Sequence, residues 1–164
     1  MMRKRILNPI TMLFAGLFLG AASRFFDMYF EVLGNIFSQM AIWILLGTLI
    51  SVYSKTRKKA MLNVLLFCIG MLITYYAAAM ITYGVYGKQF IIGWTIFAIC
   101  SPIMAFFAWM TKENGAFPKI ISVGIVIVSV LSSVILFDRL RIYDVLINGI
   151  LIYILFFAKV RREK

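Results

Sequence analysis

Long apolar runs separated by short polar segments make up nearly the whole chain. Six of these runs lie at about residues 6–23, 33–53, 60–83, 90–110, 120–137 and 142–158. Each has close to the roughly 20 apolar residues that an α-helix needs to cross a bilayer. Each is expected to be helical, because lipid offers no hydrogen-bonding partners to an open backbone. The pattern therefore predicts an all-α fold, a polytopic bundle of six transmembrane helices that forms a single domain over residues 1–164.

Cap and turn residues agree with these boundaries. Asn8-Pro9 supplies a helix cap and a first-turn proline for the first run. Asn114-Gly115 predicts a turn before the fifth run. The basic segment MMRKR is similar to the start of a signal peptide, but no cleavage site leads into a soluble region. The first run is therefore interpreted as a retained helix.

The composition excludes a soluble domain and several kinds of chemistry. Hydrophobic residues make up 63% of the chain and charged residues 14%, against about 45–50% and 25% in soluble proteins. The net charge of +11 would suggest nucleic-acid binding in a soluble protein. Here the basic residues cluster between apolar runs, so the predicted partner is the lipid bilayer and not nucleic acid. There is no histidine, and Cys68 and Cys100 lie in separate runs without metal-binding spacing. We therefore predict no metal, no cofactor and no enzymatic activity.

Most basic residues fall on one side of the predicted membrane. They lie near the two ends of the chain and in the loops after the second and fourth runs, namely Arg3, Lys4, Arg5, Lys55, Arg57, Lys58, Lys59, Lys112, Lys119, Lys159, Arg161, Arg162 and Lys164. Cytoplasmic loops of membrane proteins are enriched in Lys and Arg. We therefore expect both termini in the cytoplasm and the protein in a bacterial plasma membrane.

Two short segments, EVLGN at 31–35 and DVLIN at 144–148, each place an acid four residues before an Asn. Positions four apart lie on one face of a helix. Each segment therefore predicts a polar stripe at the outer end of a helix, beside the other charges of the outer loops. The predicted outward-facing ligand site comprises Arg24, Asp27, Glu31, Asn35, Asp138, Arg139, Arg141, Asp144 and Asn148.

The same residues also have a structural interpretation. In a ligand site Arg24 and either Arg139 or Arg141 would bind anionic groups, and Glu31 and Asp144 would bind cationic or hydroxyl groups. The two asparagines would hydrogen-bond the ligand one turn deeper. In the alternative, the acids stabilise the positive ends of helices and the asparagines join neighbouring helices. Ser122, Ser129 and Ser133 share one face of the fifth predicted helix and are interpreted as packing residues. The sequence leaves both interpretations of the charged residues open.

Small residues in the first run predict a close helix contact. Gly16 and Gly20 form a G-x-x-x-G pattern beside Ala15, and such patterns let two helices approach closely. The contact is either with another helix of the bundle or with a partner subunit that docks on this face. The sequence supports both.

The predicted architecture resembles the substrate-binding S-components of energy-coupling-factor vitamin transporters. It shares their size, six helices, cytoplasmic termini, outward site and small residues in the first helix, where Ala15, Gly16 and Gly20 would stand for the docking motif. Leu19 departs from the usual Ala-x-x-x-Ala counted from Ala15. The resemblance implies a small-molecule ligand and partner membrane and ATPase subunits. The chain also resembles small multi-pass membrane proteins of low-GC bacteria, a likeness that implies no activity.

Two functions follow from these features. The first is a small-solute transport component with an outward-facing polar site. The second is a non-transporting accessory or assembly subunit of a larger membrane complex, which binds its partner through the glycine face of the first helix.

Overall fold

A computed structural model describes residues 7–82, 87–138 and 140–160, and within them the chain is helical with no strand. The helices are α2 (Pro9–Tyr29), α3 (Glu31–Phe37), α4 (Met40–Tyr53), α5 (Arg57–Ile81), α6 (Lys88–Met110), α7 (Ala116–Phe137) and α8 (Ile142–Ile152), which continues directly into the π-helix η1 (Tyr153–Phe157). The all-α prediction is confirmed.

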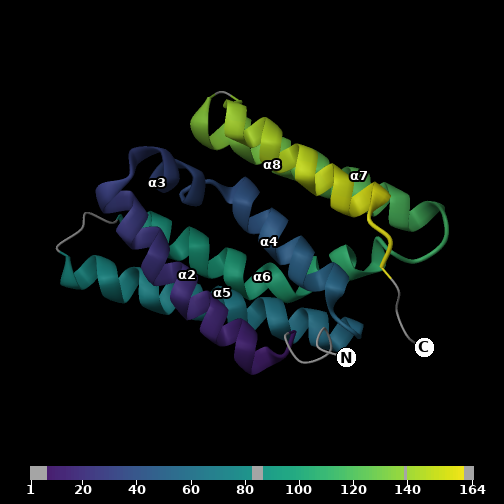
Figure 1. Cartoon of the computed structure of the whole chain (residues 1–164), viewed down its shortest axis with the longest axis horizontal. Helices are drawn as coiled ribbons and strands as arrows, with labels where there is room; N and C mark the ends of the chain where they lie inside the picture. The colour runs from purple at the N-terminus through teal and green to yellow at the C-terminus, as the bar shows by residue number, and fades with distance from the viewer. Residues whose placement is uncertain (1–6, 83–86, 139, 161–164) are drawn as a thin grey trace.

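The helices run back and forth along one long axis with α4 at the centre (Figure 1). Helix α4 packs against α5, α6, α7 and α8. Its Trp43 belongs to an apolar cluster with Phe67 and Met71 of α5, and its Ile44 belongs to a second cluster with Leu151 of α8. Helix α2 lies against α5 on one side of the bundle, and α7 pairs with α8 on the other (Figure 1).

The outside of the bundle is apolar, as expected of a surface that faces lipid. Phe18 is 74% exposed and Ile135 is 72% exposed, whereas the side chains of Gln39, Asn63 and Asp144 are fully buried. In the described chain four helices are long and apolar enough to cross a membrane, and the bent α3–α4 pair would make five. The segment Ile142–Phe157 is apolar but shorter. These helices are compatible with an integral membrane protein.

Local signals set several helix ends where the sequence predicts them. The side chain of Asn8 accepts a hydrogen bond from the backbone N–H of Ile10, and α2 then begins at Pro9. Between α6 and α7, Gly115 has a φ of 131°, which a residue with a Cβ rarely adopts. The predicted turn before the fifth run is confirmed. Pro102 lies inside α6, which continues through it to Met110.

The glycine face of α2 is packed against α5 of the same chain. A Cβ at Gly16 would overlap the carbonyl oxygen of Phe67, and one at Gly20 would overlap the carbonyl oxygen of Met71. The hydroxyl of Thr74 donates a 2.7 Å hydrogen bond to the Leu17 carbonyl across this contact. Ala15 also packs on the cluster that contains Trp43. The three residues predicted to dock a partner therefore face the interior, which is the within-bundle alternative.

Two details of the predicted helices differ from the structure. The first predicted helix ends at about residue 23, but α2 continues to Tyr29, so Arg24 and Asp27 are helical and not in a loop. The added turns place Asp27 beside Tyr75 of α5 and Arg24 beside Thr82, the C-cap residue of α5. The second predicted helix, residues 33–53, is broken between α3 and α4 with a bend of 60°.

Charged residues separate between the two ends of the bundle. The basic end is the end at which α2 begins and η1 ends (Figure 1), and it carries Lys55, Arg57, Lys58, Lys59, Lys112, Lys119 and Lys159. The acidic end is opposite and carries Asp27, Glu31, Asp138 and Asp144, together with Arg24, Lys88 and Arg141. For the described residues, the fold therefore places the basic loops at one end and the acidic loops at the other, as the apolar runs predicted.

Candidate functional site

The predicted ligand residues at the acidic end fall into two clusters on different helices. In the first, Asp27 near the end of α2 accepts hydrogen bonds from the hydroxyls of Tyr75, at 2.7 Å, and Ser38, at 3.3 Å. Arg24, one turn earlier, donates to the hydroxyl of Thr82 at 3.1 Å. This Asp27 cluster therefore ties α2 to α3 and α5.

The EVLGN segment forms the short helix α3, folded back against the end of α2. Gly34 makes this possible, because a Cβ there would lie 2.9 Å from the Cα of Asp27. Glu31 starts the helix and is exposed, and Asn35 is half-buried. Glu31 thus lies in the first turn, after the N-cap Phe30, and makes no capping hydrogen bond within the described chain, and the stripe from Glu31 ends after two turns, where the helix breaks.

The break between α3 and α4 contains a buried amide. Gln39 has an extended backbone, with φ of −88° and ψ of 144°, and precedes α4 as its N-cap. Its side chain is fully buried, and neither Nε2 nor Oε1 has a hydrogen-bond partner in the described chain. The indole N–H of Trp43 donates to the Phe37 carbonyl at 2.8 Å and so satisfies the backbone on the other side of the break. Gln39 was not among the predicted site residues, although an amide inside an apolar run was a signal for it.

The second cluster lies between α7 and α8. Asp144 is fully buried and accepts hydrogen bonds from the backbone N–H of Arg141, at 2.8 Å, and from the hydroxyl of Ser133, at 3.3 Å. Asn148 donates from Nδ2 to the Asp144 carbonyl at 2.8 Å. Ser133 was interpreted from the sequence as a packing residue, but in the structure its hydroxyl donates a hydrogen bond to the carboxylate of Asp144. We call Ser129, Ser133, Asp144 and Asn148 the Asp144 cluster.

The remaining predicted residues lie around the α7–α8 turn. Asp138 is exposed and ends α7 with a φ of 58°. The guanidinium of Arg141 donates to the hydroxyl of Tyr143 and lies 5.7 Å from the centre of that ring. Arg139 lies outside the described residues.

The two similar sequence segments therefore occupy unlike environments. The carboxylate nearest to EVLGN is that of Asp27, which accepts hydrogen bonds from Ser38 at the end of α3 and from Tyr75 of α5. The carboxylate of DVLIN is that of Asp144, which accepts hydrogen bonds from Ser133 of α7 and from the backbone of Arg141 at the start of α8. Glu31 is exposed, whereas Asp144 is fully buried. The structure thus places the described members of the predicted site at one end of the bundle, where Asp27 and Asp144 belong to two separate hydrogen-bonded groups.

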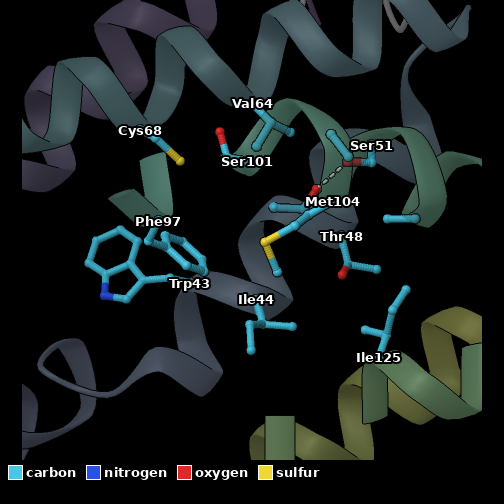
Figure 2. Close-up of a pocket in the computed structure, with 13 residues that line it drawn as sticks. Trp43, Ile44, Thr48, Ser51, Val64, Cys68, Phe97, Ser101, Met104 and Ile125 are labelled. Carbon is cyan, nitrogen blue, oxygen red and sulfur yellow. Dashed lines mark hydrogen bonds between the residues drawn. The ribbon is translucent and has the colours of Figure 1, made fainter. Parts of the chain in front are cut away.

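The centre of the bundle holds a cavity of about 50 Å³ between α4, α5, α6 and α7. Figure 2 shows Met104 reaching into it, with Cys68 and Ser101 on one wall and Thr48 on another. Most of its lining side chains are apolar. Pockets for small organic ligands are typically about 300–1,000 Å³, so this cavity is too small to be a solute site.

A larger hollow of about 620 Å³ lies at the basic end, between the α6–α7 turn and the end of η1. The ammonium group of Lys112 donates to the carbonyls of Ile154, Leu155 and Ala158. It therefore caps the π-helix, where carbonyls lack helical partners. The hollow lies at the opposite end of the bundle from the predicted ligand residues.

The described residues bring together no group of three or more His, Cys, Asp or Glu side chains that would hold a metal ion. Comparison with protein-family models, with curated proteins and with solved structures found no match to this chain. Its function is therefore inferred from its own residues.

Proposed function

We propose that the chain is a six-span protein of a bacterial plasma membrane, with both termini in the cytoplasm, that acts as a component for the transport of a small polar solute. The asymmetry of charge supports this orientation, since the basic end matches the enrichment of Lys and Arg on the cytoplasmic side. The acidic end then faces outward. In this arrangement α8 and η1 form the sixth span.

The proposed sixth span is short. The segment Ile142–Phe157 comprises 16 residues, which gives about 24 Å of helix at 1.5 Å per residue. The hydrocarbon core is about 30 Å thick. A short span is accommodated by local thinning of the bilayer and by basic side chains that extend to the interface, and Lys159 lies two residues after the segment.

The single observation that carries the transport proposal is the unpaired amide of Gln39 at the break in the second span. An unpaired polar group away from water costs free energy, and polar groups at membrane depth are commonly functional. Transporters build their solute sites at breaks in spanning helices, where ends of half-helices and irregular backbone face the substrate. Gln39 presents one amide donor group and one acceptor at such a break.

Groups beside the break suit a polar solute. Ser38, adjacent to Gln39 in the chain, connects the break to Asp27 and through it to Tyr75. A solute with both donor and acceptor groups would satisfy the Gln39 amide, and the carboxylate of Asp27 would attract a hydroxyl or cationic group. Arg24, one turn away, would serve an anionic group.

A partner subunit that supplies energy, as the resemblance to S-components implies, would need a docking surface other than the one predicted. The face of Gly16 and Gly20 is filled by α5. Gly93, Gly124 and Gly149 are exposed and have open space beside them. The lipid-facing sides of α6, α7 and α8 are therefore open to a partner.

Native mass spectrometry of the gently extracted protein tests the proposal. We expect wild type to retain a small molecule, Gln39→Leu to lose it, and Gln89→Leu, which changes an exposed glutamine in the first turn of α6, to retain it. If Gln39→Leu also retains the small molecule, the solute site is not at the break. Membrane partners that co-purify with no small molecule would instead support an accessory subunit.

A further inference from the structure

Buried oxygen atoms form two levels between α7 and α8. These helices run antiparallel and pack side by side (Figure 1). The hydroxyl of Ser133 lies 3.3 Å from Oδ1 of Asp144, which fixes the register of the pair. Four residues further from the acidic end on each helix lie Ser129 and Asn148. Because the helices are antiparallel, this step of four residues on each helix places Ser129 and Asn148 at the same depth, about 6 Å further from the acidic end than Ser133 and Asp144.

The deeper level has two unpaired oxygen atoms. Oγ of Ser129 and Oδ1 of Asn148 are buried and have no hydrogen-bond partner within the described residues. The orientation of the Asn148 amide is determined, because its other atom faces the Asp144 carbonyl, which can only accept. Its oxygen therefore remains available. Buried oxygen atoms in this state are costly unless a ligand satisfies them.

The cluster carries a single negative charge. Asp144 is fully buried, with no ion pair to another described residue, and its two hydrogen bonds come from a backbone N–H and a hydroxyl. The nearest arginine in sequence, Arg141, directs its guanidinium to Tyr143. A buried charge is stable only if a counter-charge or strong hydrogen bonds compensate it.

From these observations we infer that the Asp144 cluster binds one dehydrated sodium ion. The atoms of the cluster that could coordinate an ion are all oxygen atoms, and hard cations prefer oxygen ligands. One monovalent cation neutralises one carboxylate, whereas a divalent cation would leave a net positive charge in the bundle. The carboxylate of Asp144, Oδ1 of Asn148 and the hydroxyls of Ser129 and Ser133 are the ligands from this chain.

A proton alone would not satisfy the same atoms. Protonation would neutralise Asp144, but it would leave the oxygens of Asn148 and Ser129 unpaired. A sodium ion between the two levels satisfies the charge and both oxygens together. This inference depends on α7 and α8 and not on the solute site at Gln39. If the transport proposal also holds, the sodium ion is the coupling ion.

The test is the sodium dependence of thermal unfolding of the purified full-length chain. NaCl replaces N-methyl-D-glucamine chloride at constant ionic strength, so that general screening is unchanged. A ligand that binds only the folded state raises its stability as its concentration exceeds the dissociation constant. We expect a saturable rise in the unfolding temperature of wild type. Ser129→Ala, which removes only an unpaired oxygen, should raise the half-saturating sodium concentration at least about tenfold, and Asn148→Leu should abolish the response.

Matched variants separate a sodium site from general effects. Asn63→Leu removes another buried amide with an unpaired oxygen, on α5 and without a carboxylate, so it should lower stability and leave the sodium response intact. Gln39→Leu should also keep the response, which separates this inference from the proposed solute site. A wild type insensitive to sodium, or the wild-type response in Ser129→Ala and Asn148→Leu, would overturn the inference. An equal rise in unfolding temperature on acidification without sodium would assign the cluster to a proton instead and overturn it as well.

Discussion

Gly20 and Gly124 show how differently two glycines of long apolar helices are used. Gly20 lies against the α5 backbone, at the carbonyl of Met71 and the hydroxyl of Thr74. At Gly124 on α7, no atom from elsewhere in the described chain lies within 4 Å of the place where a Cβ would stand. The close approach of α2 and α5 therefore requires the first glycine, and no packing contact of the described residues requires the second.

A pair of alanine substitutions tests this contrast. Gly20→Ala should lower the free energy of unfolding by about 1–3 kcal/mol, because overpacking forces two backbones apart. Gly124→Ala should leave stability unchanged or raise it by up to about 1 kcal/mol, because alanine loses less conformational freedom than glycine. Unfolding of both variants in the same detergent measures the difference. Equal stability of the two would contradict the contact between α2 and α5.

At the scale of elements, the break between α3 and α4 is stabilised by a side chain from beyond it. Helix α3 ends at Phe37, and the indole of Trp43, one turn into α4, donates to the Phe37 carbonyl. The ring of Trp43 also packs edge-on against Phe37, at 5.9 Å between ring centres. The break is thus a defined bend, in which the Phe37 carbonyl has a partner and, among the described residues, the Gln39 amide has none.

Replacing the indole tests the role of this hydrogen bond. Trp43→Phe keeps an aromatic ring but leaves the Phe37 carbonyl unpaired, and should cost about 0.6–1.5 kcal/mol of unfolding free energy. Trp94→Phe is the control, because Trp94 packs against Trp43 with ring centres 6.5 Å apart and its N–H has no acceptor in the described chain. Chemical unfolding monitored by helicity compares the two. A larger loss in Trp94→Phe would show that ring packing, and not the hydrogen bond, holds the bend.

At the scale of the whole molecule, the separation of charge between the two ends is the basis of the proposed membrane orientation. The Lys-rich loops and η1 meet at the basic end, where Arg57 pairs with Glu113 at 2.5 Å and lies 5.2 Å from the centre of the Trp109 ring. Four carboxylates lie at the other end. An apolar surface between the ends completes the arrangement of a membrane protein.

Labelling of single cysteines in intact cells tests this orientation. In a background without Cys68 and Cys100, a membrane-impermeant maleimide should label Glu31→Cys and Asp138→Cys from outside and should leave Lys55→Cys unlabelled until the cells are opened. Lys159→Cys should behave like Lys55→Cys, because α8 and η1 are proposed to cross. Labelling of Lys159→Cys from outside would show five spans instead of six. Labelling of Lys55→Cys and Lys159→Cys from outside, without labelling of Glu31→Cys and Asp138→Cys, would reverse the orientation.

The sequence by itself determined the fold class and most helix positions. Run length, the Asn8 cap and the Asn114-Gly115 turn act over a few residues, so a linear pattern contains them. The grouping of basic and acidic loops followed from the same pattern, since consecutive helices alternate in direction.

The tertiary structure decided everything that depends on which helices meet. The assignment of Gly16 and Gly20 to α5, the continuation of α2 through Asp27 and the break at Gln39 all depend on contacts between residues distant in sequence. The clearest case is the pair EVLGN and DVLIN. Their patterns match, yet Glu31 is exposed while Asp144 is buried beside Ser133 of α7. A periodic pattern specifies which residues share a helix face, but only packing specifies what that face meets.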